Sequence, residues 1–123
     1  MKTLKKILVV DDEQDLRNLL TERLMAAGYN VSTAINGKEG LEKATAEKPD
    51  LIILDVMLPD TDGFKLCGLI KSNKEMKNIP IIMLTCLGQI EDIKAAIEKG
   101  ASAYIAKPFD PKVLLSRIRA LIG

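Results

Sequence analysis

The 123-residue sequence contains no histidine and no tryptophan, and aromatic residues make up only 3% of it. Histidine is a usual zinc ligand, a member of the Ser-His-Asp triad and the commonest general base, so its absence excludes sites that depend on it. The two cysteines, Cys67 and Cys86, form neither a CxxC motif nor a disulfide framework, which fits a reducing cytoplasm. The sequence therefore removes several large classes of catalytic and metal site.

A charge excess and a long apolar run are also missing. The chain has 18 basic and 17 acidic residues, a net charge of +1, which disfavours nucleic acid as a direct partner. No apolar run approaches the ~20 residues that span a bilayer, so no membrane role is expected. The apolar run near the N-terminus, residues 7–10, is too short for a secretory signal. With 47% hydrophobic and 28% charged residues, the composition predicts one cytoplasmic globular domain over residues 1–123.

Short apolar or β-branched runs alternate with longer helical patterns along the chain. Runs that are apolar at every position are typical of parallel strands buried on both faces, and they occur at Ile7–Val10, Leu51–Leu54 and Ile81–Leu84. Asn30–Ala34 alternates and suits an edge strand, and Ala103–Ala106 is the fifth candidate. These runs predict a five-stranded parallel sheet.

Apolar residues at helical spacing lie between and after these runs. They predict a helix through Leu16, Leu19, Leu20 and Leu24 that ends at Gly28, a weaker helix at Leu41 and Ala44, and a third helix over about Gly63–Asn73. A fourth helix is marked by Ile90, Ile93 and Ile97, and a fifth opens at Asp110-Pro111 and carries Leu114, Ile118, Leu121 and Ile122. Five β-α units with right-handed crossovers predict an α/β, doubly wound sheet of order 2-1-3-4-5, with five helices on both faces.

Polar side chains follow most of these strands at the point where each ends. Asp11 and Asp12 follow the first strand, Asp55 the third, Thr85 the fourth and Lys107 the fifth. In an open parallel sheet, function collects outside the carboxyl ends of the strands, where the winding reverses. With the predicted order, the first and third strands are neighbours, so Asp11, Asp12 and Asp55 should converge.

Three converging carboxylates repel one another unless a cation neutralises them. An all-oxygen site without cysteine or histidine suits Mg²⁺, which keeps waters that a phosphate can replace. Lys107 adds a positive charge and Thr85 a hydroxyl donor. Together these groups predict a phosphoryl-transfer site in which a carboxylate attacks phosphorus.

These residues stand in motifs that closely resemble the response-regulator receiver domains of two-component signalling, including the single-domain chemotaxis regulators. The matching segments, in the family's order and spacing, are Val9–Glu13, Asp55–Gly63, Leu84-Thr85 and Lys107–Phe109. The resemblance implies a flavodoxin-like fold and a phosphoacceptor switch that is not an enzyme in the turnover sense.

The resemblance also implies a role for each site residue. Asp55 would accept a phosphoryl group from a sensor histidine kinase or phosphotransfer protein. Asp11 and Asp12 would hold Mg²⁺ together with Asp55 and the Met57 carbonyl. Lys107 would pair with a phosphate oxygen across a Lys107-Pro108 bond that is usually cis, while Thr85 and Tyr104 would switch.

The family's surfaces for other proteins are implied in the same way. The kinase contact would be the first helix and the loop of Pro108 and Phe109. The output surface, formed by the fourth helix, fifth strand and fifth helix, would change for a downstream effector. Dimerisation on phosphorylation stays open, as does whether the chain is a single-domain regulator or part of a longer protein.

One position departs from the family's usual pattern, and two lie where the family varies. Cys86 stands where a small residue is preferred and would narrow access to Asp55. Met57 and Leu87 occupy the positions at which the family varies its rate of phosphate loss. Because both are apolar, neither can hold an attacking water, so a long-lived phosphorylated state is expected.

Simpler interpretations remain for the individual residues. Asp11–Glu13 would also suit the start of the first helix, Asp55 a turn, Thr85 a strand and Lys107 a solvated surface. Cys67 is expected to fill the core, and Lys112, Arg117 and Arg119 to form a solvated face.

Three other functions also compete with the phosphoacceptor switch. A Mg²⁺-dependent aspartate-nucleophile phosphohydrolase would usually place a second aspartate two residues after the nucleophile, but Glu13 and Met57 stand there. A flavin-binding module would need a phosphate-binding loop where Asp11–Glu13 lies. A receiver-like module that is never phosphorylated is the third alternative.

Overall fold

A computed structural model describes residues 3–86, 94 and 97–123 of the chain. Within them, five parallel strands form one sheet of order β2-β1-β3-β4-β5, which confirms the predicted topology. The strands are β1 (Lys6–Val10), β2 (Asn30–Ala34), β3 (Leu51–Asp55), β4 (Ile81–Thr85) and β5 (Ala103–Ala106). The helices are α1 (Gln14–Ala26), α2 (Gly37–Glu47), α3 (Gly63–Ser72) and α5 (Pro111–Ile122).

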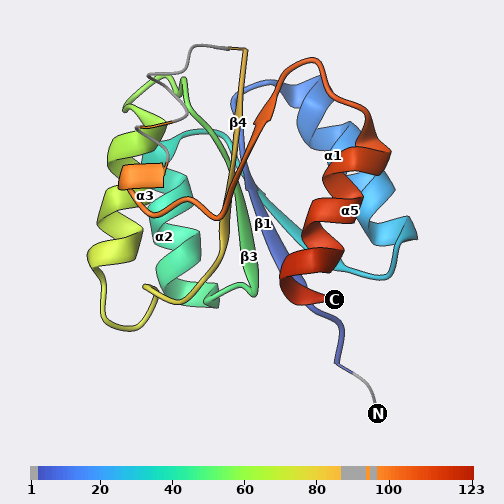
Figure 1. Cartoon of the computed structure of the whole chain (residues 1–123), viewed down its shortest axis with the longest axis horizontal. Helices are drawn as coiled ribbons and strands as arrows, with labels where there is room; N and C mark the ends of the chain where they lie inside the picture. The colour runs from blue at the N-terminus through green and yellow to red at the C-terminus, as the bar shows by residue number, and fades with distance from the viewer. Residues whose placement is uncertain (1–2, 87–93, 95–96) are drawn as a thin grey trace.

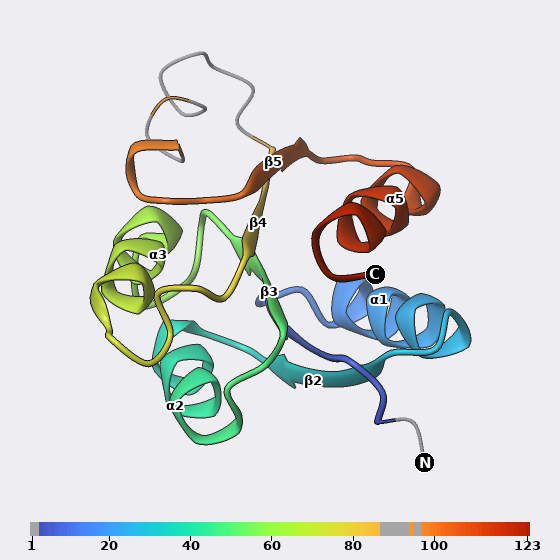
Figure 2. The ribbon, with the colours of Figure 1, turned by 60° about the horizontal axis from the view of Figure 1, so that its bottom comes forward.

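Helices cover both faces of the sheet, as the apolar runs predicted. Helices α2 and α3 lie on one face and α1 and α5 on the other (Figures 1 and 2). Alternate residues of β1 and β3 point to opposite faces, so Leu8 and Ile52 enter the α2–α3 core while Ile7 and Ile53 enter the α1–α5 core. All four are fully buried. Burial on both faces explains why Ile7–Val10 of β1 and Leu51–Leu54 of β3 are apolar at every position.

The register of the strands brings their carboxyl ends to one edge of the sheet, at the top of Figure 1. Val10 pairs with Leu54, Asp55 with Leu84, and Thr85 with Ala106. The residue that follows each central strand therefore emerges at nearly the same level. This alignment, and not proximity in sequence, positions the candidate site.

Side-chain caps begin most of the described helices. Asn36 accepts a hydrogen bond from Glu39 N (2.8 Å) at the start of α2, Asp62 accepts one from Phe64 N (2.8 Å) at α3, and Asp110 accepts one from Lys112 N (2.9 Å) at α5. Gly28 follows α1 with a φ of +99°, a conformation that glycine adopts without steric cost. The Lys107-Pro108 peptide bond is cis, as the resemblance implied.

Two of the predicted helices differ from the prediction or are described only in part. The predicted fourth helix lies largely outside the described residues, and of its marker residues only Ile97 is described, with a helical backbone and a side chain that is 67% exposed. In α1, Leu20 and Leu24 are buried as predicted, but Leu19 is 38% exposed. The face of α1 that contacts the sheet is narrower than the stripe of apolar residues on the helix. Leu19, at the margin of that stripe, lines a surface cavity instead.

Candidate functional site

Three carboxylates converge at the edge where β1 and β3 end. Asp11 and Asp12 follow β1, and Asp55 is the last residue of β3. One carboxylate oxygen of each lies within 4.8 Å of those of the other two. Asp11 is fully buried, Asp55 is 6% exposed and Asp12 is exposed. The predicted convergence is thus present, and the cluster opens to solvent on the side of Asp12.

The Lys107 ammonium group, delivered by β5 from the other side of β4, connects the two buried carboxylates. Its Nζ donates to Asp11 Oδ2 at 2.9 Å and to Asp55 Oδ2 at 3.2 Å. A third bond goes to Glu13 Oε1 at 3.2 Å. The Lys107 side chain is 15% exposed, so these are charge-assisted bonds in a partly dry environment. Lys107 is therefore not a solvated surface lysine.

The other oxygen of each buried aspartate is used by the backbone. Asp11 Oδ1 accepts from Glu13 N at 2.9 Å, and Asp55 Oδ1 accepts from Met57 N at 3.1 Å. The turn interpretation of Asp55 is therefore correct as well, whereas α1 has no side-chain cap, because Asp11 bonds the amide of Glu13, which precedes the helix. These two bonds orient each carboxylate so that Oδ2 faces Lys107, and they do not compete with a role in the cluster.

Burial and charge act in opposite directions on this cluster. Burial raises the pKa of Asp55 and the nearby Asp11 charge raises it further, while the Met57 amide and Lys107 lower it; the net pKa is above the ordinary value of aspartate. Burial alone lowers the pKa of Lys107, but its bonds to Asp11 and Glu13 and the charge of Asp55 outweigh burial and raise it. The lysine thus stays protonated, and Asp55 takes up a proton more readily than an ordinary aspartate does.

The loop between β3 and α3 folds back tightly beside Asp55. Gly63 N donates to Val56 O at 2.6 Å, and Met57 forms an isolated antiparallel bridge with Asp62. A Cβ on Gly63 would lie 2.1 Å from the Asp55 carbonyl oxygen, so this approach requires glycine. The Met57 side chain is 59% exposed, which leaves the residue at the open side of the loop.

Thr85 is the last residue of β4 and lies next to the cluster. Tyr104 lies on β5, two residues before the end of that strand. Thr85 is 1% exposed, and its carbonyl accepts from Lys107 N at 2.6 Å, so β4 directly positions the lysine. Tyr104 pairs with Met83 and packs partly buried against the α2–α3 core. Their expected movement on phosphorylation stays a prediction.

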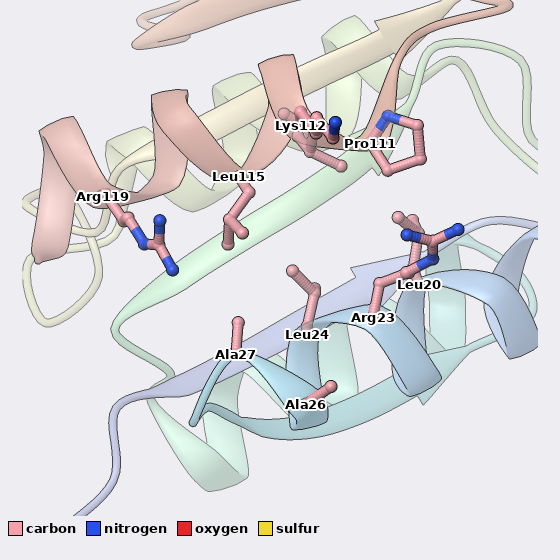
Figure 3. Close-up of a pocket in the computed structure, with 10 residues that line it drawn as sticks. Leu20, Arg23, Leu24, Ala26, Ala27, Pro111, Lys112, Leu115 and Arg119 are labelled. Carbon is pink, nitrogen blue, oxygen red and sulfur yellow. The ribbon is translucent and has the colours of Figure 1, made fainter.

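Two cavities border α1. A cavity of about 420 Å³ adjoins the lysine and is lined by Glu13, Leu16, Leu19, Cys86, Lys107, Pro108 and Phe109. The other, of about 320 Å³, lies between α1 and α5. Figure 3 shows its apolar residues, such as Leu24 and Leu115, together with the basic side chains of Arg23 and Arg119. Only the first cavity is continuous with the carboxylate cluster, through Lys107 and Glu13.

The sequence predicts the cluster but not two contacts of nearby acidic residues. Glu13 belongs to the acidic run that follows the first strand, yet its bond to Lys107 was not predicted. Asp60 lies within the matching segment Asp55–Gly63, and its carboxylate accepts hydrogen bonds from two backbone amides of α2. Both contacts depend on the course of the loops that follow β1 and β3. The only indication of them in the sequence is that acidic residues are present in those loops.

The arrangement is a pocket of carboxylate oxygens that share the ammonium group of Lys107. Such a pocket can hold a hard divalent cation, and its nearly buried Asp55 can act as a nucleophile toward phosphorus. No helix among the described residues is long and apolar enough to cross a bilayer.

Comparisons with known proteins agree with this geometry. Residues 7–119 match the family described as the response regulator receiver domain. The alkaline phosphatase synthesis transcriptional regulatory protein PhoP of Bacillus subtilis is 47% identical over 118 residues, which cover 96% of this chain and 48% of that protein. The chain thus spans about half the length of the curated relatives that it matches.

Solved structures extend the likeness to the whole described fold. Chemotaxis protein CheY4 of Vibrio cholerae superposes with a TM-score of 0.92 at 34% identity, covering 97% of this chain and 99% of that one. The BeF3-activated N-terminal receiver domain of Klebsiella pneumoniae RstA gives a TM-score of 0.88 at 35% identity, covering 96% and 98%. The chain therefore belongs to the response regulator receiver domains, the phosphoacceptor signalling domains of two-component systems.

Proposed function

We propose that Asp55 is the phosphoryl acceptor of this domain and that Asp11, Asp12, Asp55 and the Met57 carbonyl hold Mg²⁺. The observation that carries the proposal is the convergence of three carboxylate oxygens within 4.8 Å beside one shared ammonium group. Burial first, and the charge of Asp11 as well, raise the pKa of Asp55. A cation beside Asp55 would favour its charged form against both causes.

The residues present fit magnesium by their chemistry. Every side-chain donor in the cluster is a carboxylate oxygen, the ligand type that hard cations prefer. Asp12 is exposed, so one side of the pocket is open to the waters that Mg²⁺ retains. When bound, the metal would neutralise the carboxylates and the charge on the phosphoryl oxygens.

The chain's own residues perform the transfer. The Asp55 carboxylate attacks phosphorus in line, and an O–P bond forms as the P–N bond to the donor histidine breaks. The imidazole leaves with the bonding electrons and takes a proton from solvent. Lys107 is already within 3.2 Å of Asp55 Oδ2, so it can move onto a phosphoryl oxygen without leaving Asp11.

The donor would dock at the cavity beside Lys107, which is lined partly by α1 and by the residues that follow β5. Leu16, Leu19 and Phe109 give this cavity an apolar wall adjacent to the charged cluster. That combination suits a kinase or phosphotransfer protein whose phosphohistidine is surrounded by apolar side chains. The Asp55 side chain is 8% exposed, so the donor must present the phosphoryl group closely.

The output would follow from Thr85 and Tyr104. New phosphoryl oxygens on Asp55 would draw in the Thr85 hydroxyl, and Tyr104 would move inward behind it. This shift would change the surface of the fourth helix, β5 and α5 that a downstream effector binds, although the fourth helix lies largely outside the described residues. Dimerisation through the fourth helix and α5 would be one form of that response.

Intact mass spectrometry after incubation with acetyl phosphate tests the acceptor. With Mg²⁺ the native chain should gain one phosphoryl group, and it should gain none in EDTA. Asp55→Asn should abolish labelling, whereas Asp50→Asn, at the opposite end of the sheet, should not. Labelling that persists in Asp55→Asn would place the nucleophile elsewhere, and continued turnover of a small phosphomonoester would indicate a phosphohydrolase.

A further inference from the structure

Asp60, in the loop between β3 and α3, binds the first turn of a different element, helix α2. Its Oδ1 accepts from Gly37 N at 2.7 Å and its Oδ2 accepts from Lys38 N at 2.9 Å. The next amide, Glu39 N, is bonded by Asn36 at 2.8 Å. The first three amides of α2 are therefore all satisfied, two of them by a residue more than 20 positions away.

The contact between the loop and α2 is close as well as polar. A Cβ at Gly37 would lie 2.2 Å from Thr61 Cγ2 and 3.2 Å from Asp60 Oδ1, so a larger residue there would displace the Thr61 side chain. The amides of Gly37 and then Lys38 lower the pKa of Asp60, which shows that they favour its charged form. A negative group at a helix N-terminus is also favoured by the helix dipole. We call this contact, Asp60 with the amides of Gly37 and Lys38, the α2 latch.

The α2 latch is connected to both halves of the carboxylate cluster. On the loop side, Met57 is paired with Asp62, and Met57 N donates to Asp55 Oδ1 at 3.1 Å. The segment between Asp55 and Asp62 is therefore fixed near both ends, and Asp60 fixes it between them. The path of the backbone at Met57, whose carbonyl is a proposed ligand, depends on these anchors.

On the helix side, α2 packs directly on β1. A Cβ at Gly40 would lie 2.9 Å from Val10 Cγ1, and Val10 immediately precedes Asp11. The helix is thus seated against the strand that delivers Asp11. Through the α2 latch, the loop that follows β3 is tied to an element that is itself seated on β1.

We propose that Asp60 is a positioning residue that sets the spacing between the β1 and β3 ligands and thereby raises the affinity for Mg²⁺. The inference rests on the proposed function, because it assumes that Mg²⁺ binds at the carboxylate cluster. Asp60 itself contacts neither the metal nor the phosphoryl group. Its effect is mechanical: it holds the loop that carries Met57 next to the cluster of Asp55 and Asp11.

Linkage makes this proposal reciprocal. If the α2 latch raises Mg²⁺ affinity, then Mg²⁺ must stabilise the α2 latch by the same factor. The amide hydrogens of Gly37 and Lys38 should therefore exchange more slowly when Mg²⁺ is bound. A residue that only contributed to general stability would not show this coupling at two particular amides.

The test compares three variants of the whole chain by titration with Mg²⁺ alone, followed by NMR. Asp60→Ala removes both bonds, and Asp60→Asn keeps one acceptor oxygen. Asp50→Ala is the matched control, because Asp50 also accepts a 2.7 Å bond from a backbone amide, Lys6 N, but at the other end of the sheet. We expect Asp60→Ala to weaken Mg²⁺ binding about tenfold, the lower end of the loss seen for residues that orient metal ligands. Asp60→Asn should fall between, and Asp50→Ala should bind as the native chain does.

Hydrogen exchange and labelling by acetyl phosphate complete the test. Mg²⁺ should slow exchange at Gly37 and Lys38 in the native chain and at neither in Asp60→Ala. The labelling deficit of Asp60→Ala should disappear at saturating Mg²⁺. Native Mg²⁺ affinity in a folded Asp60→Ala, or Mg²⁺-independent exchange at both amides in the native chain, would overturn the positioning role. A native chain that binds no Mg²⁺ would instead overturn the proposed function, and this inference with it.

Discussion

Replacing Lys107 with methionine removes an ammonium group that contacts two buried carboxylates and keeps a side chain of similar length. Lys107 Nζ lies 2.9 Å from Asp11 Oδ2 and 3.2 Å from Asp55 Oδ2, and these aspartate side chains are 0% and 8% exposed. Its third partner, Glu13, is 62% exposed and contributes little. The variant would leave two nearly buried like charges without compensation.

The expected cost follows from that burial. At an effective dielectric constant of about 20, each buried contact has a gross Coulomb energy of roughly 5 kcal/mol, much of which desolvation offsets. Removing one partner of a buried ion pair costs about 3–5 kcal/mol in practice. We therefore expect Lys107→Met to lose about 3–5 kcal/mol of unfolding free energy in EDTA at neutral pH. Urea unfolding followed by circular dichroism measures this loss.

Lys48→Met is the matched control. Lys48 Nζ also lies 2.9 Å from a carboxylate oxygen, that of Glu75, but these side chains are 52% and 69% exposed. Its loss should be within about 1 kcal/mol. Equal losses in the two variants would refute the argument that burial, and not distance, decides the cost.

The pH dependence of Lys107→Met has a definite sign. Burial and Asp11 already raise the pKa of Asp55, and Lys107 is one of the groups that lower it. Without the lysine the native state binds a proton more readily than the unfolded state, so the unfolding free energy should rise as pH falls toward the unfolded-state pKa of about 3.9. A free Mg²⁺ concentration of 100 times the dissociation constant should raise the unfolding free energy of the variant by about 2.7 kcal/mol. Acid, Mg²⁺ and the second substitution Asp55→Asn should each reduce the loss of unfolding free energy in Lys107→Met. If none of them does, repulsion between the two buried carboxylates is not the cause of that loss.

Three further predictions follow from single positions. Met57→Asn should shorten the lifetime of the phosphorylated state, because an amide can hold an attacking water where the exposed methionine cannot; a much longer lifetime would contradict this. Gly63→Ala should cost about 3 kcal/mol or more in urea unfolding, because its Cβ would lie 2.1 Å from the Asp55 carbonyl oxygen. Gly68→Ala, whose Cβ meets only a side-chain atom at 3.5 Å within α3, should gain about 0.5–1 kcal/mol. Asp60→Asn should make the unfolding free energy fall less steeply as the solution is made acidic. The lowered pKa of Asp60 in the folded state stabilises the native chain above the unfolded-state pKa, and this stabilisation is lost as pH falls through the folded-state pKa. An unchanged acid dependence would argue against the two amide bonds.

The sheet was predictable from sequence because burial on both faces imposes apolar residues at every position of a central strand. Ile52 and Ile82 are fully buried, and the strands that carry them end at a polar residue. Parallel pairing then brings Asp55 and Thr85 to one edge without further information. The convergence of the candidate site follows from this pairing alone.

The remaining details depend on features that a linear pattern does not contain. Helical spacing placed Leu19 and Leu121 on apolar stripes, but they are 38% and 37% exposed, because the width of the covering contact is set by the partner elements. The bonds of Asp60 to α2 depend on the path of a loop whose composition only indicates a turn. The three partners of Lys107 depend likewise on the side-chain rotamers of groups from different strands.

The two cysteines differ sharply in their surroundings. Cys67 is fully buried in α3, its Sγ lies 3.5 Å from the Lys99 carbonyl oxygen, and burial raises the pKa of its thiol. Cys86 is exposed and lines the cavity beside Lys107. A thiol-reactive fluorophore should therefore attach at Cys86 alone, which gives the unmodified sequence a built-in optical probe one residue from Thr85. Encounter with a donor protein could then be followed in real time without engineering an attachment site.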